Sequence, residues 1–96
     1  MRKAGSFDAQ KYRDNPKMIA KYLNVALASD DAAMIVKAIG DMLRAHGIAR
    51  VSTKTGLRRE GLYRSFKGHM APGFDTVLKA LLALDVRLVT KPHGSR

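Results

Sequence analysis

Seven basic side chains are concentrated in one quarter of the chain, between residues 44 and 67. Glu60 is the only acidic residue in that stretch, so the segment carries a net charge of +6. Guanidinium and ammonium groups bind phosphates and base edges, and this surplus favours a polyanionic partner. The alternative is that these side chains form an ordinary charged surface that is solvated and binds no partner. The basic residues are Arg44, Arg50, Lys54, Arg58, Arg59, Arg64 and Lys67.

Side chains that could catalyse a reaction or hold a metal are few and scattered. The three histidines, His46, His69 and His93, lack the spacing of metal ligands, and the chain has no glycine-rich phosphate loop. A nonspecific RNA binder would call for more stacking aromatics near the basic cluster than Tyr63 alone. We therefore expect a protein that is not an enzyme and uses no metal or other cofactor.

The length and composition predict one small folded domain. The chain has 96 residues, of which 46% are hydrophobic and 27% charged, and its net charge is +10. It has no cysteine, which is typical of a reducing compartment. No segment has the apolar run of a secretory signal or of a membrane span. These features together predict a cytoplasmic protein without membrane contact.

The apolar pattern predicts an all-helical domain over residues 14–90, between an N-terminal arm at 1–13 and a disordered tail at 91–96. Five helices are expected, at about 16–29, 31–46, 49–55, 59–67 and 72–84. Residues 86–90 alternate as a short strand would, and a lone strand is marginal in water. They are expected either to pair with a symmetry mate or to form an extended, frayed tail.

Two short helices within residues 48–68 are predicted to form a helix-turn-helix. Gly56 lies between them, and a sharp turn needs a residue that tolerates positive φ. Val51, Leu62 and Phe66 are expected to point inward, with Leu57 tucked beneath the turn, which leaves the arginines outside.

The segment from Val51 to Leu82, VSTKTGLRREGLYRSFKGHMAPGFDTVLKALL, resembles the helix-turn-helix of phage-repressor-like (Xre-type) regulators. The resemblance extends further. FDAQKY, DNPKMIAKYLNVALASDDAAMIVKAIGDMLRAHGIARVSTKTGL and LYRSFKG are similar to the HigA-like family of addiction-module antidote proteins.

These resemblances imply a five-helix, lambda-repressor-like DNA-binding domain. They also imply the antitoxin of a type II toxin–antitoxin module, which represses its own operon as a homodimer and neutralises a RelE/ParE-like toxin. A stand-alone phage-type regulator without a toxin partner is the alternative.

In such a motif the second helix enters the major groove, and its first residues reach base edges. Arg59, Glu60 and Tyr63 are the expected base contacts, with Arg59 suited to guanine. Glu60 could instead be an exposed i,i+4 partner of Arg64. One motif reads few base pairs, so a homodimer on a palindromic double-stranded operator is expected. The expected phosphate contacts are Arg50, Lys54, Arg58, Arg64 and Lys67.

Two aromatic residues stand out in the N-terminal arm. Phe7 and Tyr12 are expected to pack either on the chain's own core or on a partner, and the toxin is then the partner they would contact.

Overall fold

The computed structural model describes residues 9–94 and contains only helices within that range, which confirms the all-α class. Five of the six helices occupy the segments expected to be helical. Their bounds are α1 Ala9–Tyr12, α2 Pro16–Leu27, α3 Ala32–His46, α4 Ile48–Thr55, α5 Arg59–Ser65 and α6 Phe74–Ala83.

Side-chain caps define where the two long helices begin. The Asn15 side chain accepts a hydrogen bond from the Met18 amide at 3.2 Å, and Pro16 occupies the first turn of α2. Asp31 caps α3 in the same way, through the Met34 amide at 3.2 Å. Gly47, at φ 115°, ends α3 and begins α4, so the chain changes direction without a linker.

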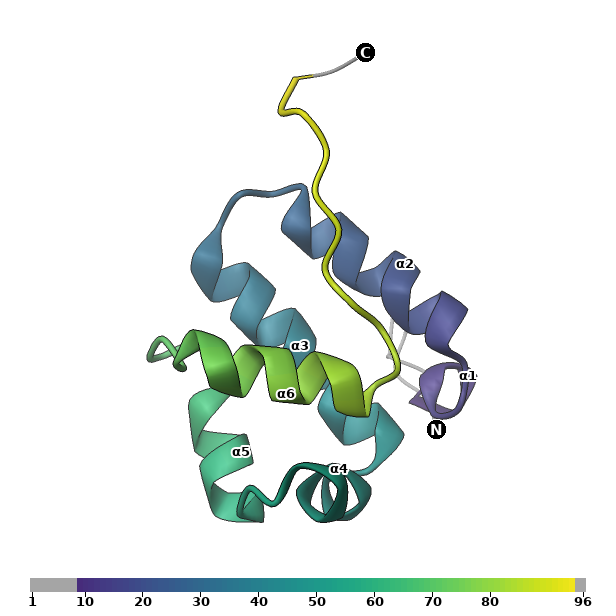
Figure 1. Cartoon of the computed structure of the whole chain (residues 1–96), viewed down its shortest axis with the longest axis vertical. Helices are drawn as coiled ribbons and strands as arrows, with labels where there is room; N and C mark the ends of the chain where they lie inside the picture. Colours follow the sequence, from purple (N-terminus) through teal and green to yellow (C-terminus); the bar gives the residue numbers. More distant parts are fainter. Residues whose placement is uncertain (1–8, 95–96) are drawn as a thin grey trace, which may run out of the picture.

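Helix α3 is the centre of the fold, because α1, α2, α4 and α6 all contact it. Figure 1 shows α6 crossing in front of α3, with α4 and α5 together at one end of the molecule. Met42 and Leu43 of α3 are fully buried, and Val51, Leu62 and Phe66 extend the same core into α4 and α5. The two short helices are therefore part of the main core.

The expected N-terminal arm contains a docked helix. Helix α1 packs on α3 and α2, and the rings of Tyr12 and Tyr22 meet edge to face with centroids 5.5 Å apart. Tyr12 also packs against the core cluster. The arm predicted at 1–13 is thus helical in its last part, whereas Phe7 lies outside the described residues. The sequence shows too few apolar residues there for α1 to have been predicted.

A series of side-chain contacts joins α2 to α3. The Tyr22 hydroxyl donates a hydrogen bond to Asp41 at 2.8 Å, and Arg44 forms an ion pair with the same carboxylate at 2.6 Å. Burial of the phenol, followed by this bond to Asp41, raises the pKa of Tyr22 to about 12. The hydroxyl therefore stays protonated, as a donor, at neutral pH.

In the described chain, the segment after α6 contains no strand and runs as an extended tail, whereas its pairing with a symmetry mate stays a prediction. Asp85, at φ 63°, turns the chain out of α6, and the Val86 amide donates to the Leu81 carbonyl at 3.1 Å. Val86 packs against the core, and Leu88 lines an apolar groove between α2, α3 and α6. Figure 1 shows this tail in yellow, running past α2. Within residues 9–94, no helix is both long and apolar enough to span a membrane.

Gly40 sets how closely α5 approaches α3. A Cβ at this buried position would overlap the carbonyl oxygen of Phe66, which is backbone and cannot swing aside. We expect Gly40→Ala to lower the free energy of unfolding by about 1–3 kcal/mol, the usual cost of overpacking a core. Thermal or urea denaturation monitored by circular dichroism measures it.

Gly61→Ala is the matched control, because a Cβ at that helical position meets no atom within 4 Å. Its stability should rise by up to about 1 kcal/mol from helix propensity alone. Equal stabilities for the two variants would contradict the close approach at Gly40.

Candidate nucleic-acid interface

A short turn, held by three side-chain hydrogen bonds, joins α4 to α5. Gly56 ends α4 in the left-handed region at φ 79°, as the sequence predicted. The Ser52 hydroxyl donates to the Leu57 carbonyl at 2.6 Å, and the Leu57 amide donates to the Thr55 hydroxyl at 3.1 Å. That hydroxyl in turn donates to the Val51 carbonyl at 2.8 Å. These bonds fix the angle between the helices, and the role of Ser52 could not be predicted from the sequence.

Helix α5 is anchored by its inner face alone. Leu62 and Phe66 are 2% and 1% exposed, and they meet Val51 of α4 in the core. Arg58 occupies the N-cap position with extended backbone, and its side chain makes no capping bond. The helix is only seven residues long, so it depends on this packing for its stability.

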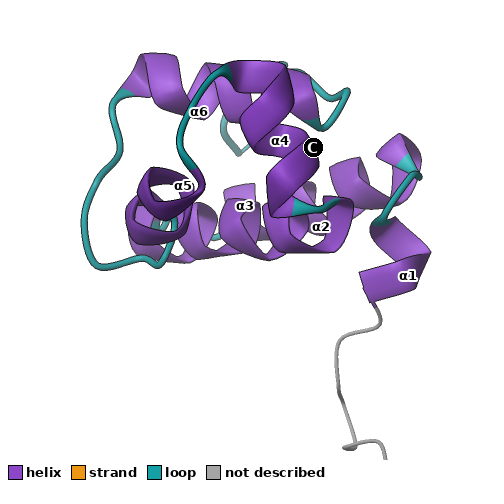
Figure 2. Ribbon diagram, turned by 90° about the horizontal axis from the view of Figure 1, so that it is seen from below, coloured by secondary structure: helices purple, strands orange, loops and turns teal. Residues whose placement is uncertain are grey.

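The outer face of α5 carries the three residues expected to read bases. Arg59 and Glu60 are exposed, and Tyr63 is 43% exposed. Within the described chain, none of the three makes a side-chain hydrogen bond or ion pair. Their polar groups are therefore available to a ligand. Figure 2 looks onto the end of the molecule formed by α4 and α5.

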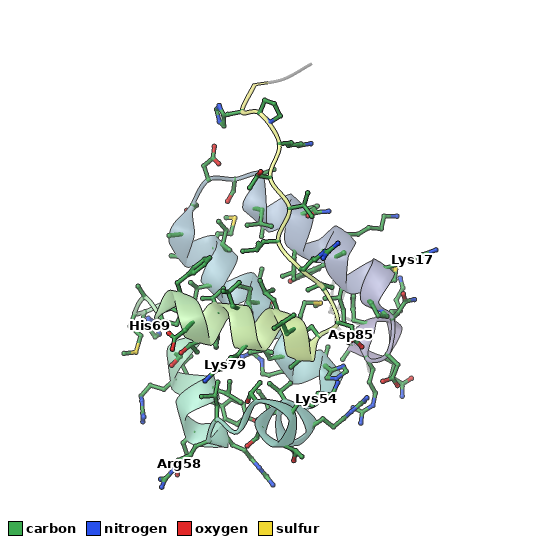
Figure 3. All side chains as sticks on the ribbon, viewed as in Figure 1. Lys17, Lys54, Arg58, His69, Lys79 and Asp85 are labelled. Atoms are coloured by element: carbon green, nitrogen blue, oxygen red, sulfur yellow. The ribbon has the colours of Figure 1, made fainter. Side chains whose placement is uncertain are left out.

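Three of the five residues expected to contact phosphates surround that face. Arg58, Arg64 and Lys67 are exposed and belong to the turn, to α5 and to the segment just after it. Arg58 points away from the body of the molecule in Figure 3. Arg64 forms no ion pair with Glu60 in the structure, so the i,i+4 pair considered for Glu60 is not formed there. The result is a cationic surface with one central carboxylate.

Arg50 is engaged by its own chain. Its guanidinium forms an ion pair with Asp14 at 2.8 Å and donates to the His46 carbonyl at 3.2 Å. The hydrogen bond from Arg50, partly opposed by desolvation, lowers the pKa of Asp14 below its usual value. Arg50 therefore links α4 to the start of α2.

Lys54 is also engaged, in a junction of four segments. Its ammonium donates to the Ala83 carbonyl at 3.0 Å, at the end of α6, and contacts Nε2 of His46 at 3.1 Å. Nδ1 of His46 lies 2.7 Å from the Arg13 carbonyl. A carbonyl only accepts, so Nδ1 carries the proton and Nε2 accepts from Lys54. Figure 3 shows Lys54 between α4 and the end of α6, near Asp85.

The structure thus divides the predicted basic residues into two groups. Arg58, Arg59, Arg64 and Lys67 make no side-chain hydrogen bond or ion pair within the described chain, whereas Arg50 and the likewise exposed Lys54 join helices. Lys54 is separated from His46 by the break at Gly47 and from Ala83 by 29 positions, so the sequence could not reveal this junction.

A small polar cavity of about 90 Å³ lies beside the junction, lined among others by His46, Lys54, Asp14 and Asp85. Its lining mixes cations with the carboxylates of Asp14, which pairs with Arg50, and of Asp85, which is exposed. No group of three or more possible metal-ligating side chains occurs among residues 9–94. The exposed face of α5 is therefore the candidate site.

Buried and placed beside a cation, His46 makes stability depend on pH. Burial first, and Lys54 in addition, lower the pKa of His46 below its ordinary value of 6.5, although its bond to the Arg13 carbonyl opposes this. The unfolded chain therefore binds a proton more readily than the folded one. Stability should be full above pH 6.5 and should fall as pH drops from 6.5 toward the lowered pKa.

We expect His46→Asn to flatten this dependence, since its amide can still donate to the Arg13 carbonyl but does not titrate. Urea denaturation at pH 8.0 and pH 5.5 measures the change. The proposed role of His46 is wrong if both proteins lose the same stability between these two values.

Comparisons with known proteins place the chain. A family model described as "probable addiction module antidote protein" matches residues 3–92. A protein of Haemophilus influenzae, described as "uncharacterized protein", is 35% identical over 81 residues, which is 84% of each chain. No solved structure matches significantly. The matched residues include α1 to α6 and the turn that presents α5. The chain belongs to the addiction module antidote protein family.

Proposed function

We propose that this chain is the antitoxin of a type II toxin–antitoxin module and represses its own operon. In this proposal it acts in the cytoplasm as a homodimer on a palindromic operator and neutralises a RelE/ParE-like toxin. It performs no catalysis and needs no cofactor. The antidote family implies a toxin partner of some kind. The resemblance to HigA-like and Xre-type proteins supports the finer assignments.

One observation carries the DNA-binding role: a short helix is held rigidly from within while its outer face is cationic and unpartnered. Leu62 and Phe66 fix α5, and Arg59, Glu60 and Tyr63 face solvent without partners in the described chain. A helix supported in this way fits the major groove, which is wide enough to admit it.

The three outer residues suit different base edges. Arg59 can donate two parallel hydrogen bonds to guanine, which discriminates by about 1–3 kcal/mol. Glu60 can accept from the amino group of cytosine, and a carboxylate at this place repels phosphates, so it adds selectivity rather than affinity. Tyr63 offers a hydroxyl and an apolar ring edge beside them.

Phosphate contacts are assigned to the solvent-facing cations. Arg58, Arg64 and Lys67 surround α5 and can neutralise backbone charge on both sides of the groove. Lys54 is better explained as a structural residue, because its ammonium already binds the end of α6. Arg50 keeps part of its surface exposed and could exchange Asp14 for a phosphate.

The toxin is proposed to bind the surface formed by α1 and α2, away from the end of the molecule that carries α5. Tyr12 and Phe7 were the residues expected to contact it. Tyr12 is half-buried against Tyr22, so its main contribution is to hold α1 in place for the partner. This leaves α5 free for DNA while a toxin is bound.

DNA binding is tested with duplex from immediately upstream of the protein's own gene, over a salt series and against scrambled competitor. Arg59→Ala should relax specificity at one operator position by about 1–3 kcal/mol. Arg64→Ala should weaken all sequences and lower the salt slope by about one unit per protomer. Sequence-blind binding by the wild type would refute the operator role.

Arg87→Ala is the control, because Arg87 is exposed in the tail. Its substitution removes the same charge at a position away from α5. It should leave specificity unchanged. A loss of affinity equal to that of Arg64→Ala would show that only overall charge matters.

Neutralisation is tested by co-expression with the toxin-like reading frame adjacent to the gene. Wild-type protein should restore growth, and Arg59→Ala should restore it equally, because α5 lies apart from α1 and α2. Growth that is not restored, or the lack of such a reading frame, would favour the stand-alone regulator.

A further inference from the structure

Helix α6 presents a stripe of large apolar side chains to solvent. Phe74, Leu78 and Leu82 are 65%, 40% and 66% exposed and recur every four residues. Ala80 and Leu81, on the inner side, are buried. An amphipathic helix that merely covers a core would have polar residues at these three positions. The stripe therefore needs a second explanation besides folding.

The stripe continues into the apolar groove beside it. The groove has a volume of about 150 Å³ and is lined by Phe74 together with Leu27 of α2 and Leu88 of the tail. Leu88 is itself 39% exposed, and Val89 next to it is 81% exposed. At roughly 150–200 Å² for each side chain of this size, the stripe, Leu27 and Leu88 together expose on the order of 400 Å² of apolar area.

This area fits a protein interface. A standard interface buries about 800 Å² per partner, and homodimer interfaces are about 65% apolar. The stripe and the groove residues beside it would supply most of that apolar share, with polar neighbours forming the rim. Surfaces of this size on small soluble domains are often functional.

The position of the stripe relative to α5 points to a second copy as the occupant. Figure 1 shows α6 lying across the front, with α4 and α5 at one end, and Figure 2 looks onto that end with α6 at its edge. The apolar face of α6 and the end of the molecule that carries α5 therefore lie on different sides. A two-fold axis that crosses α6 would bring two α6 helices face to face and leave both α5 helices on the same side.

The charges beside the stripe agree with an antiparallel pairing of α6. Asp75 and Lys79 are exposed and follow Phe74 and Leu78 by one residue, so they flank the stripe on the same side. Figure 3 shows Lys79 on the side of α6 that is turned toward α5. When two α6 helices cross antiparallel at Leu78, Asp75 of one copy lies beside Lys79 of the other. Opposite charges would therefore meet at the rim of a contact between two chains of net charge +10.

We propose that a second copy of this chain covers the α6 stripe, with Leu78 on the two-fold axis. The inference deepens the proposed function, on which it rests, because it names the surface that joins two operator-binding halves. Contact through α6 also leaves the tail bound to its own chain, so the pairing of two tails is not required.

The chain has no cysteine, so a single introduced thiol reports on one position. A disulfide needs Cα atoms about 4.4–6.8 Å apart, which only residues near the axis satisfy. Under mild oxidation Leu78→Cys should form a covalent dimer in high yield on non-reducing gels. Val25→Cys is the control, because Val25 is 76% exposed and lies on the opposite side of α2 from the buried Leu23. It should stay monomeric on the gel.

Leu78→Glu tests the energetics without oxidation. It removes two apolar side chains from the centre and sets two carboxylates opposite each other, so the dimer dissociation constant should rise about a hundredfold or more. Sedimentation without DNA measures it, and circular dichroism checks the fold. Val25→Glu should have no effect.

Exchange of the rim charges, in Asp75→Lys with Lys79→Asp, should restore the dimer that either single change weakens.

A monomeric wild type at about 100 μM would overturn the proposal, as would a dimer unaffected by Leu78→Glu. So would a monomer whose binding to the toxin is lost in Leu78→Glu, since the toxin would then be the occupant. Specific operator binding by a monomer would refute this interface and leave the DNA-binding role intact. A dimer cross-linked at position 78 that lacks specific DNA binding would support the interface and refute that role.

Discussion

The approach of the Phe66 backbone to Gly40 determines where α5 lies. The carbonyl of Phe66 fills the space that any other side chain at position 40 would occupy, so the residue that ends α5 lies directly against the central helix. A glycine within a helix costs about 1 kcal/mol of helix propensity. That local cost is offset by the burial of Phe66 and Leu62, which are the two anchors of α5. The turn at Gly56 determines the direction of α5, and the missing side chain of Gly40 determines how close the end of α5 lies to α3.

Features that depend on neighbouring residues could be predicted from the sequence. The ends of α3 and α4 follow from Gly47 and Gly56, and many buried positions follow from apolar spacing. On α6 the same spacing misleads, because Phe74, Leu78 and Leu82 are exposed. Features that depend on distant partners could not. The bond from Lys54 to Ala83 joins residues that are 29 positions apart, and Gly40 looks like an unremarkable helical glycine until Phe66 is placed against it.

The basic cluster shows the same limit for the candidate site. By type and spacing, Lys54 and Arg64 are equivalent cations near the turn. In three dimensions both are exposed, but the ammonium of Lys54 binds the end of α6, whereas Arg64 makes no side-chain hydrogen bond or ion pair within residues 9–94. The difference arises because α6 returns to α4, a contact between segments far apart in the chain. Sequence reasoning located the cationic surface, but only the fold separates its structural members from those free to bind.

The outer side chains of α5 are independent of the core that carries them. Arg59, Glu60 and Tyr63 have no partners within the described chain, and the interior contacts of the helix involve other residues. Under the proposed function, these three positions can change through mutation without loss of folding. Related modules that coexist in one genome could thus diverge in operator choice and avoid cross-regulation while they retain a common scaffold.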